Sequence, residues 1–449
     1  MKHFKKTLVL LVTVAMLATL FGCAPKDAAG GPGGNNTQNA EKPELTIWFF
    51  PMGTTDPYAA ACQQVLDEYN AGDHGATVKM EILGWAGLNE RVQTAVASGS
   101  PPDVWIPGYF RVSEYVKMGE ALDLSSIVEG WKAANDPILD DFYPGTMENG
   151  TYDGKTYVIP FATSPKTLYY RSDILEDELG FKDLDKGVTF DQLKEICAAV
   201  KEKYGDQGIY PMGFFSTDGG TTNLMLNVLF SNGASWVNAD ASAGGFDDPK
   251  AIEAVEFIKE LVDSGYVPEG IVSYNQADID KLYETGKIAM MWKSSLHDPS
   301  SEYYSKTKIM GTIMGPSADK GRIVTWSDGL MAFKGTKHPE EVKEFIEWFV
   351  KNSSVILDEG ATSYVPLRKS QESLDVYKND WILGQTTPLA DTFTELNWPA
   401  PVSPVCFNQV FFEGIIGKPL EAVLMGAEDV EAEMLKVNDT ITKLLQEVG

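Results

Sequence analysis

Strands and helices alternate along the first part of this chain, and this alternation is the strongest constraint on its fold. Residues 44–50 and 77–82 have the apolar content of strands, and residues 57–69 between them have a helical pattern. A second amphipathic helix is expected over 88–96, before a glycine, and a third strand over 103–106. The β-α-β-α-β order predicts a mainly parallel sheet flanked by helices, which is an α/β fold.

The same mixed order recurs further along the chain. A Thr-x-x-Gln capping box predicts a helix over 189–203, an Asp-Pro pair predicts another over 248–262, and Pro339 opens a third. The apolar stripe of this third helix consists of Val342, Phe345, Ile346, Phe349 and Val350. A body of about 405 residues is too long for one ordinary core, so we expect two domains.

Residues 1–22 have the pattern of a signal peptide. Three lysines near the start are followed by 15 uncharged residues, Thr7 to Phe21. Such a helix would reach only roughly 22 Å, which is short of the ~30 Å hydrocarbon core of a membrane. We therefore interpret the segment as a cleaved signal and not as a membrane span.

The signal ends in Leu-Phe-Gly-Cys, which resembles a bacterial lipobox with Cys23 as the residue that receives the lipid. The alternative is a secreted protein with an incidental cysteine. Residues 23–43 are rich in Gly, Asn and Pro and poor in apolar side chains, so they are expected to form a flexible tether. The resemblance implies a palmitate-type lipoprotein on the outer face of the cell membrane, held there by its lipid anchor alone.

Charge and cysteine content exclude several classes of function. The chain has 37 basic and 64 acidic residues, which gives a net charge of −27. Cleavage of the predicted signal peptide would remove three lysines and make the mature chain still more acidic. Nucleic acid is not expected as a partner, because no basic patch is available to neutralise phosphates. Apart from Cys23, the cysteines Cys62, Cys197 and Cys406 lack metal-type spacing, and we expect no disulfide among them.

Motifs for catalysis and cofactors are missing from the sequence. Gly154-Lys155-Thr156 invites a P-loop interpretation, but Asn149 occupies the position of the required first glycine. The four histidines show no paired spacing for a metal, and no GxSxG elbow or complete EF-hand loop is present. We therefore expect no cofactor, no metal and no catalytic residue, although a pair of carboxylates that meet only in the fold remains possible.

Six segments along the body resemble a known family. They are LTIWFF (45–50), ASGSPPDV (97–104), YDGKTYVIPF (152–161), LYYRSDIL (168–175), GKIAM (286–290) and VPLR (365–368). In this order they are similar to the extracellular solute-binding proteins of the maltose-binding type (family 1), which are receptors of ABC sugar importers. The resemblance implies a monomeric, non-enzymatic receptor that delivers a carbohydrate to the transmembrane subunits of a permease, in a Gram-positive bacterium.

The resemblance also implies two lobes joined by a hinge, with the solute between them. The hinge crossings are expected at 161–164, 318–325 and 366–368. The N-terminal lobe would combine 44–160 with 326–365, and the C-terminal lobe would combine 165–317 with 369–449.

A sugar site needs flat aromatic rings for stacking and fixed polar groups for hydrogen bonds. Strand ends, loops and hinge crossings that face the expected crevice supply eleven candidates. They are Phe50, Trp85, Tyr109, Arg111, Ser164, Asp218, Trp292, Trp326, Asp328, Arg368 and Trp398. These candidates include two arginines and two aspartates, so neither positive nor negative charge is concentrated among them. A neutral mono- or oligosaccharide is therefore the expected ligand.

Two alternatives stay open. One is a surface glycoside hydrolase lipoprotein, which detectable turnover of oligosaccharides would favour. The other keeps the receptor role but changes the solute to a polyamine, a peptide or a polyol phosphate. A ligand screen that includes both sugars and charged solutes separates these alternatives.

Overall fold

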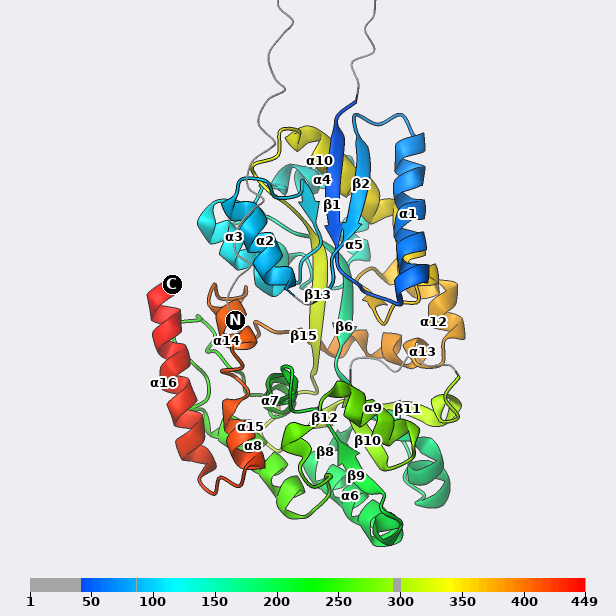
Figure 1. Ribbon diagram of the computed structural model, residues 1–449, viewed down its shortest axis with the longest axis vertical. Helices are drawn as coiled ribbons and strands as arrows, with labels where there is room; N and C mark the ends of the chain where they lie inside the picture. The colour runs from blue at the N-terminus through cyan, green and yellow to red at the C-terminus, as the bar shows by residue number, and fades with distance from the viewer. Residues whose placement is uncertain (1–41, 86, 294–299, 449) are drawn as a thin grey trace, which may run out of the picture. The chain divides into compact units, whose positions relative to one another are not determined.

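Two large hydrophobic cores, connected by the long strands in Figure 1, organise the described part of the chain. A smaller third cluster includes Tyr169, Ile279 and Met291. The computed structural model describes residues 42–448 except residues 86 and 294–299. The predicted signal peptide (1–22), the predicted lipidation site Cys23 and the predicted tether up to residue 41 lie outside the described residues. The first core is built mainly from residues 45–162 and 330–365, and the second mainly from residues 168–324 and 396–445.

The first core surrounds a seven-stranded sheet. In spatial order its strands are β14 (Val365–Pro366), β6 (Ile159–Pro165), β13 (Ile323–Ala332), β3 (Val104–Trp105), β1 (Glu44–Phe49) and β2 (Thr77–Ile82), with β15 (Phe393–Glu395) paired to β13. Strand β1 is parallel to β2 and β3, as the sequence predicts. Strand β13 is antiparallel to both β3 and β6. The sheet is thus mixed and not mainly parallel, because β13 returns from the other core and inserts between strands that run in the opposite direction.

Helices cover this sheet on its faces and edges. They are α1 (Thr55–Ala71), α2 (Leu88–Ala97), α3 (Val112–Met118), α4 (Ser125–Ala134), α5 (Ile138–Asp141), α10 (Pro339–Asn352), α11 (Ser354–Glu359) and α12 (Asp375–Asn379). Helices α1 and α10 contact each other, α1 contacts β2, and α10 contacts β6. The five residues of the predicted stripe on α10 are all buried, which confirms the helix and the face that it presents to the core.

The second core surrounds a smaller sheet. Its strands are β11 (Thr307–Met310), β7 (Thr167–Arg171), β10 (Ile288–Lys293) and β9 (Tyr210–Gly213), and only β10 and β9 are parallel among them. Short pairs add β8 (Val188–Thr189) with β12 (Ile313–Met314), and β4 (Thr151–Tyr152) with β5 (Lys155–Thr156) near the first core. This sheet is mixed as well, so neither sheet is mainly parallel as the sequence led us to expect. Among the described residues, parallel pairing is found for β1 with β2 and β3, β13 with β15, β9 with β10 and β8 with β12.

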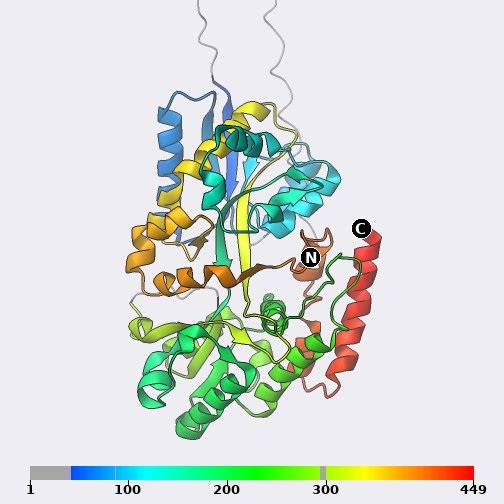
Figure 2. The same ribbon diagram turned by 180° about the vertical axis from the view of Figure 1, so that it is seen from behind.

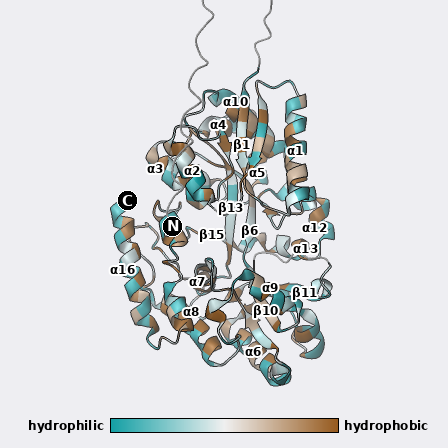
Figure 3. Ribbon diagram, viewed as in Figure 1, coloured by the Kyte–Doolittle hydropathy of each residue, from teal (hydrophilic) through white to brown (hydrophobic). Residues whose placement is uncertain are grey.

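The helices of this half are α6 (Phe190–Tyr204), α7 (Gly220–Ser231), α8 (Pro249–Asp263), α9 (Gln276–Glu284), α14 (Phe407–Phe412), α15 (Lys418–Leu424) and α16 (Val430–Val448). The predicted capping box of α6 is present: Thr189 accepts a hydrogen bond from the Gln192 backbone N–H at 3.2 Å, and Gln192 accepts one from Thr189 at 2.8 Å. The Asp248 side chain caps α8 in the predicted way. Outer helices such as α16 carry both hydrophobic and hydrophilic residues (Figure 3), as amphipathic surface helices do.

Strands β6 and β13 pair with each other and connect the two cores, which makes the fold two-lobed. Strand β6 runs from the first core toward the second, and β13 runs back. The predicted crossing at 161–164 falls on β6, and the one at 318–325 covers the segment before β13 and its first three residues. Figure 2 shows the segment that contains α13 (Leu383–Thr386) and β15, in orange, crossing these long strands. Tyr377 and Leu383 pack in the first core although they follow the expected crossing at 366–368. The lobe boundaries stay predictions.

The cysteines behave as core residues. Cys62 lies on α1 and Cys197 on α6, and both side chains are fully buried. Together with Cys406 they are free thiols in the described part of the chain. Burial raises the pKa of Cys62 and Cys197 to about 12, so neither thiol is activated as a nucleophile.

Candidate functional site

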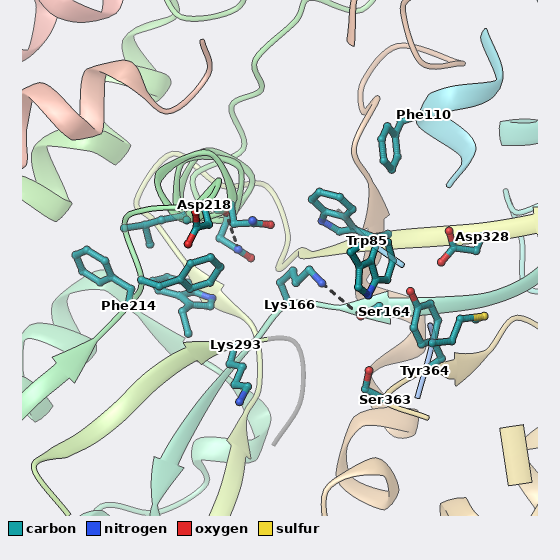
Figure 4. A pocket seen from close by; sticks show the side chains of 18 of the residues that line it. Trp85, Phe110, Ser164, Lys166, Phe214, Asp218, Lys293, Asp328, Ser363 and Tyr364 are labelled. Carbon is teal, nitrogen blue, oxygen red and sulfur yellow. Dashed lines mark hydrogen bonds between the residues drawn. The ribbon is translucent and has the colours of Figure 1, made fainter. Parts of the chain in front are cut away.

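A cavity of about 360 Å³ is lined by residues of both cores and of the two long strands (Figure 4). We call it the cleft pocket. The wall on the side of the first core includes Met52, Trp85 and Tyr364. The opposite wall, on the side of the second core, includes Phe214, Asp218, Asn223 and Trp292. Its floor consists of Ser164, Lys166, Trp326 and Asp328, together with Arg111. A ligand in this pocket would contact both lobes and the strands that connect them.

The alternation of side chains along a strand explains the floor. Trp326 is the register partner of Ser164, and Ser327 is the partner of Thr163. Because successive side chains point to opposite faces of a sheet, one set of residues faces the cleft pocket and the next set faces away. Thr163 and Thr325 line a second cavity of about 400 Å³ on the other side, which we call the rear groove.

A β-bulge sets the position of Asp328. The register between β13 and β6 shifts between Asp328 and Gly329, which is the kind of irregularity that re-aims a side chain. A Cβ at Gly329 would lie 2.4 Å from the Val158 side chain and 2.6 Å from the Ile159 carbonyl oxygen. Only glycine fits at this position without a shift of the neighbouring strand.

Asp328 is a buried carboxyl group with cationic and hydroxyl neighbours. It is 4% exposed, and Tyr364 donates a hydrogen bond to it. Burial raises the pKa of Asp328 from 3.8 to about 7, although Arg111, Tyr364 and Lys166 each act to lower it. The carboxyl group is therefore partly protonated near neutral pH.

Arg111 and Lys166 provide the positive charge of the pocket. The Arg111 Nε donates a hydrogen bond to the Asn89 Oδ1 at 2.9 Å, and burial lowers the pKa of Arg111. The Lys166 Nζ donates a hydrogen bond to the Ser164 Oγ at 3.3 Å and lies 5.2 Å from the centre of the Trp326 ring. Burial lowers the pKa of Lys166 to about 8, so the ammonium is mostly protonated at pH 7.

Aromatic rings form much of the remaining surface. Trp85 is 53% exposed at the edge of the pocket, and its ring is supported by Phe50 at a centroid distance of 4.7 Å. Phe110 packs edge-on against Trp326 at 5.3 Å. An exposed indole that is fixed from behind by another ring offers a free face to a ligand.

The wall from the second lobe begins at the loop before α7. Asp218 has a left-handed backbone with φ of 53°, a conformation that aspartate tolerates better than most residues, and its side chain is exposed. Asn223 and Asn227 follow one turn apart on α7. Lys293 at the end of β10 is paired with Asp280, with 2.6 Å between Nζ and Oδ1.

A second carboxyl group, which is partly accessible to solvent, faces the rear groove. Glu395 on β15 accepts hydrogen bonds from the backbone N–H and the hydroxyl of Ser327. Burial raises the pKa of Glu395 from 4.5 to about 8, and the nearby charge of Asp328 adds to this. Glu395 and Asp328 lie on the two sides of β13 and line different cavities.

Seven of the eleven predicted site residues line the cleft pocket: Trp85, Arg111, Ser164, Asp218, Trp292, Trp326 and Asp328. The structure places the other four elsewhere. Phe50 lies behind Trp85, and Tyr109 is buried against Gly329. Arg368 lies 4.0 Å from Asp141, and Trp398 lines the rear groove beneath the Arg322 guanidinium at 4.1 Å. A role of any of these residues in ligand binding remains a prediction.

Several lining residues were not predicted. They are Pro51, Met52, Phe110, Lys166, Phe214, Phe215, Gly220, Asn223, Leu224, Asn227, Lys293, Ser363 and Tyr364. Continuing the alternation from Ser164 would have indicated Lys166, which directly follows the end of β6 at Pro165. Tyr364 directly precedes the VPLR segment, but nothing in the sequence indicates that its hydroxyl meets Asp328.

Two searches over the described residues gave negative results. Within residues 42–85, 87–293 and 300–448, no group of three or more His, Cys, Asp or Glu side chains is arranged to hold a metal ion. In the same part of the chain, every helix is too short or too polar to cross a membrane.

Comparison with known proteins identifies the family. The model of the bacterial extracellular solute-binding protein family matches residues 53–355, about two thirds of the chain. The chain belongs to this family, whose members act outside the cytoplasm.

Relatives and solved structures agree with this assignment. A binding protein of Brucella abortus is 24% identical over 380 residues, which cover 84% of this chain and 87% of that protein. The diacetylchitobiose binding protein of Streptomyces coelicolor is 25% identical over 351 residues, covering 76% of this chain and 77% of its own. The structure of a sugar transporter from Arthrobacter chlorophenolicus, solved with bound laminaribiose, has a TM-score of 0.73 at 19% identity and covers 89% and 98% of the two chains. It has the same two-lobed fold.

Proposed function

We propose that this protein is the substrate-binding lipoprotein of an ABC importer, which captures a carbohydrate in the cleft pocket and delivers it to a membrane permease. The observation that carries the proposal is the exposed Trp85 ring at the edge of a pocket lined by both lobes. An aromatic face beside fixed charged and amide groups suits the apolar and hydroxyl-rich sides of a sugar ring.

Capture is proposed to involve closure of the lobes. Residues such as Trp85 belong to one lobe, whereas Asp218 and Trp292 belong to the other. A ligand shifts an open–closed equilibrium only by its difference in affinity for the two forms, and contacts from both walls provide that difference. Strands β6 and β13, which carry the floor, are the segments about which the lobes would move.

The comparisons support a carbohydrate as the solute. Proteins similar to this chain are named for binding diacetylchitobiose and maltodextrin, and a structure of similar fold holds laminaribiose. A cavity of about 360 Å³ lies toward the small end of the range for ligand sites, which favours a mono- or disaccharide over a long chain.

We further propose that the protein binds its ligand without converting it. Asp218 and Asp328 are the carboxyl groups that line the cleft pocket, and they lie on different parts of it. Glu395, the other carboxyl group with a strongly raised pKa, faces the rear groove and is separated from the pocket by β13. The two carboxyl groups of the cleft pocket thus come from the floor and from the loop before α7, which supports binding without hydrolysis.

The proposed anchor is the lipid on Cys23. Two acyl chains hold a protein stably at a membrane, and residues 23–43 would act as the tether between the lipid and the lobes. A Cys23→Ala variant is expected to appear in the medium and to lose incorporation of labelled palmitate. Retention of the variant on cells would contradict the anchor but not the binding function.

A thermal-shift screen tests the proposed function. The panel contains mono- and disaccharides, acidic sugars, a polyamine, a peptide mixture and a polyol phosphate. A saccharide at 100 times its Kd is expected to add ~2.7 kcal/mol to the free energy of unfolding. The proposal is wrong if no saccharide raises the melting temperature while one of the other solutes does, and product formation from a bound oligosaccharide would show an enzyme instead.

A further inference from the structure

The floor of the cleft pocket has more positive than negative charge. Arg111 and Lys166 contribute two cations, and Asp328 contributes one carboxyl group that is only partly ionised near neutral pH. Buried ionic groups are normally balanced by partners of opposite sign, because an unbalanced charge away from water is costly. The floor lacks about one negative charge in a chain whose net charge is −27.

Neighbouring carboxylates do not supply this charge. Asp280 is paired directly with Lys293, so these two residues balance each other. Asp218 is exposed on the opposite wall, where water screens it. Glu395 lies behind β13, and its raised pKa keeps it mostly neutral at pH 7.

Lys166 is the cation that makes no direct ion pair, although it is near enough to Asp328 for each to affect the pKa of the other. Arg111 is the stronger of the two cations acting on Asp328, and Tyr364 also donates a hydrogen bond to this carboxyl group. Among the described residues, no ion pair involves the Lys166 Nζ, whose contacts are the Ser164 hydroxyl and the Trp326 ring. Figure 4 shows this side chain extending along the middle of the floor, between the two walls.

We infer that the carbohydrate captured by this protein carries a carboxylate, as a uronic acid residue does, and that this carboxylate pairs with Lys166. The inference rests on the proposed carbohydrate-binding function and replaces the neutral sugar expected from the sequence. The sequence pointed to a neutral ligand because Lys166 was not recognised as part of the site. One carboxylate would balance the floor and give the ammonium a charge-assisted hydrogen bond inside a partly dehydrated pocket.

The test compares ligands that differ by one charge. Isothermal titration calorimetry at pH 7 would measure disaccharides of galacturonate, glucuronate and mannuronate, each beside its methyl ester and its neutral hexose counterpart. Hydrogen bonds to charged groups are stronger than neutral ones, so at least one acid is expected to bind roughly tenfold or more tightly than its ester. This comparison uses the unaltered protein and does not depend on a variant that folds.

Variants assign the effect to the lysine. Lys166→Met keeps the length of the side chain and is expected to bring the acid and the ester to within about twofold of each other, with the ester little changed. Lys132→Met, the same change at an exposed position of α4, is expected to leave the preference intact. A preference that survives in Lys166→Met would overturn the assignment to this residue.

The outcomes separate this inference from the proposed function. If neutral sugars bind as tightly as the acids or more tightly, the inference is wrong and the carbohydrate receptor stands. If a sugar phosphate binds and no uronate does, the carboxylate is wrong but the receptor again stands. If no saccharide of any charge binds, the proposed function fails, and the inference fails with it.

Discussion

Replacement of Glu395 by glutamine is expected to stabilise the protein, and to do so only above mildly acidic pH. The Glu395 carboxyl group accepts hydrogen bonds from Ser327 beside the rear groove, where burial raises its pKa from 4.5 to about 8. The unfolded chain releases this proton near pH 4.5, whereas the folded chain holds it until about pH 8. Stability associated with the protonated group is therefore fully present below pH 4.5 and is lost as the pH rises to about 8.

The size of the effect follows from the difference in pKa. Each pKa unit corresponds to about 1.4 kcal/mol, so a shift from 4.5 to about 8 corresponds to an upper limit of roughly 5 kcal/mol. Halfway through this window, near pH 6, the expected difference is about 2 kcal/mol. Because the Glu395 side chain is partly accessible to solvent, the measured values are expected to lie below these limits.

Urea denaturation of the wild type and Glu395→Gln at half-unit steps from pH 4 to pH 9 measures this difference. The advantage of the glutamine variant is expected to grow from its value at pH 4 and to level off above about pH 8. Glu413→Gln is the matched control, since Glu413 is exposed beside α14. A stability difference that is the same at pH 5 and pH 8 would refute the reasoning, because it would mean that Glu395 titrates alike in the folded and unfolded chains.

Two further predictions concern the cleft pocket. Trp85→Ala is expected to weaken saccharide binding about tenfold in calorimetry. Because the indole is exposed, the substitution is expected to change the free energy of unfolding by less than about 0.5 kcal/mol. Unchanged affinity would show that Trp85 is not part of the site. Gly329→Ala is expected to cost about 1–3 kcal/mol in urea denaturation, because its Cβ would lie 2.4 Å from Val158, and also to weaken binding through Asp328. Gly335→Ala is its control, with open space around the added methyl group, and equal stability of the two variants would contradict the account of the bulge.

Local patterns predicted many of the individual elements. The strand at Thr77–Ile82 has the predicted bounds, and the capping box of α6 and the apolar stripe of α10 are as expected. These features depend on residues within a few positions of one another, so a single segment contains the information. Strand direction was less predictable. Strand β13 joins the first sheet after about 150 residues of the other lobe, and its local sequence does not indicate which strands it will pair with.

The candidate site shows the same division. Trp326 and Asp328 were predicted because they belong to an expected hinge crossing, and the structure places both at the pocket. In the structure, strand alternation puts both side chains on one face of β13. Lys166 belongs to the same pattern, but a lysine after a proline was indistinguishable from a surface residue. Trp398 was expected at the crevice but lines the rear groove. The segment after α13 can pass the long strands on either side, and only the tertiary structure decides which side it takes.

A crystal structure with the saccharide that gives the largest thermal shift tests the central claim most directly. We predict that the saccharide lies in the cleft pocket, with one ring face against Trp85, contacts from both lobes, and a polar group within hydrogen-bond distance of the Lys166 Nζ. A saccharide bound outside this pocket, or held by residues of one lobe alone, would contradict the account.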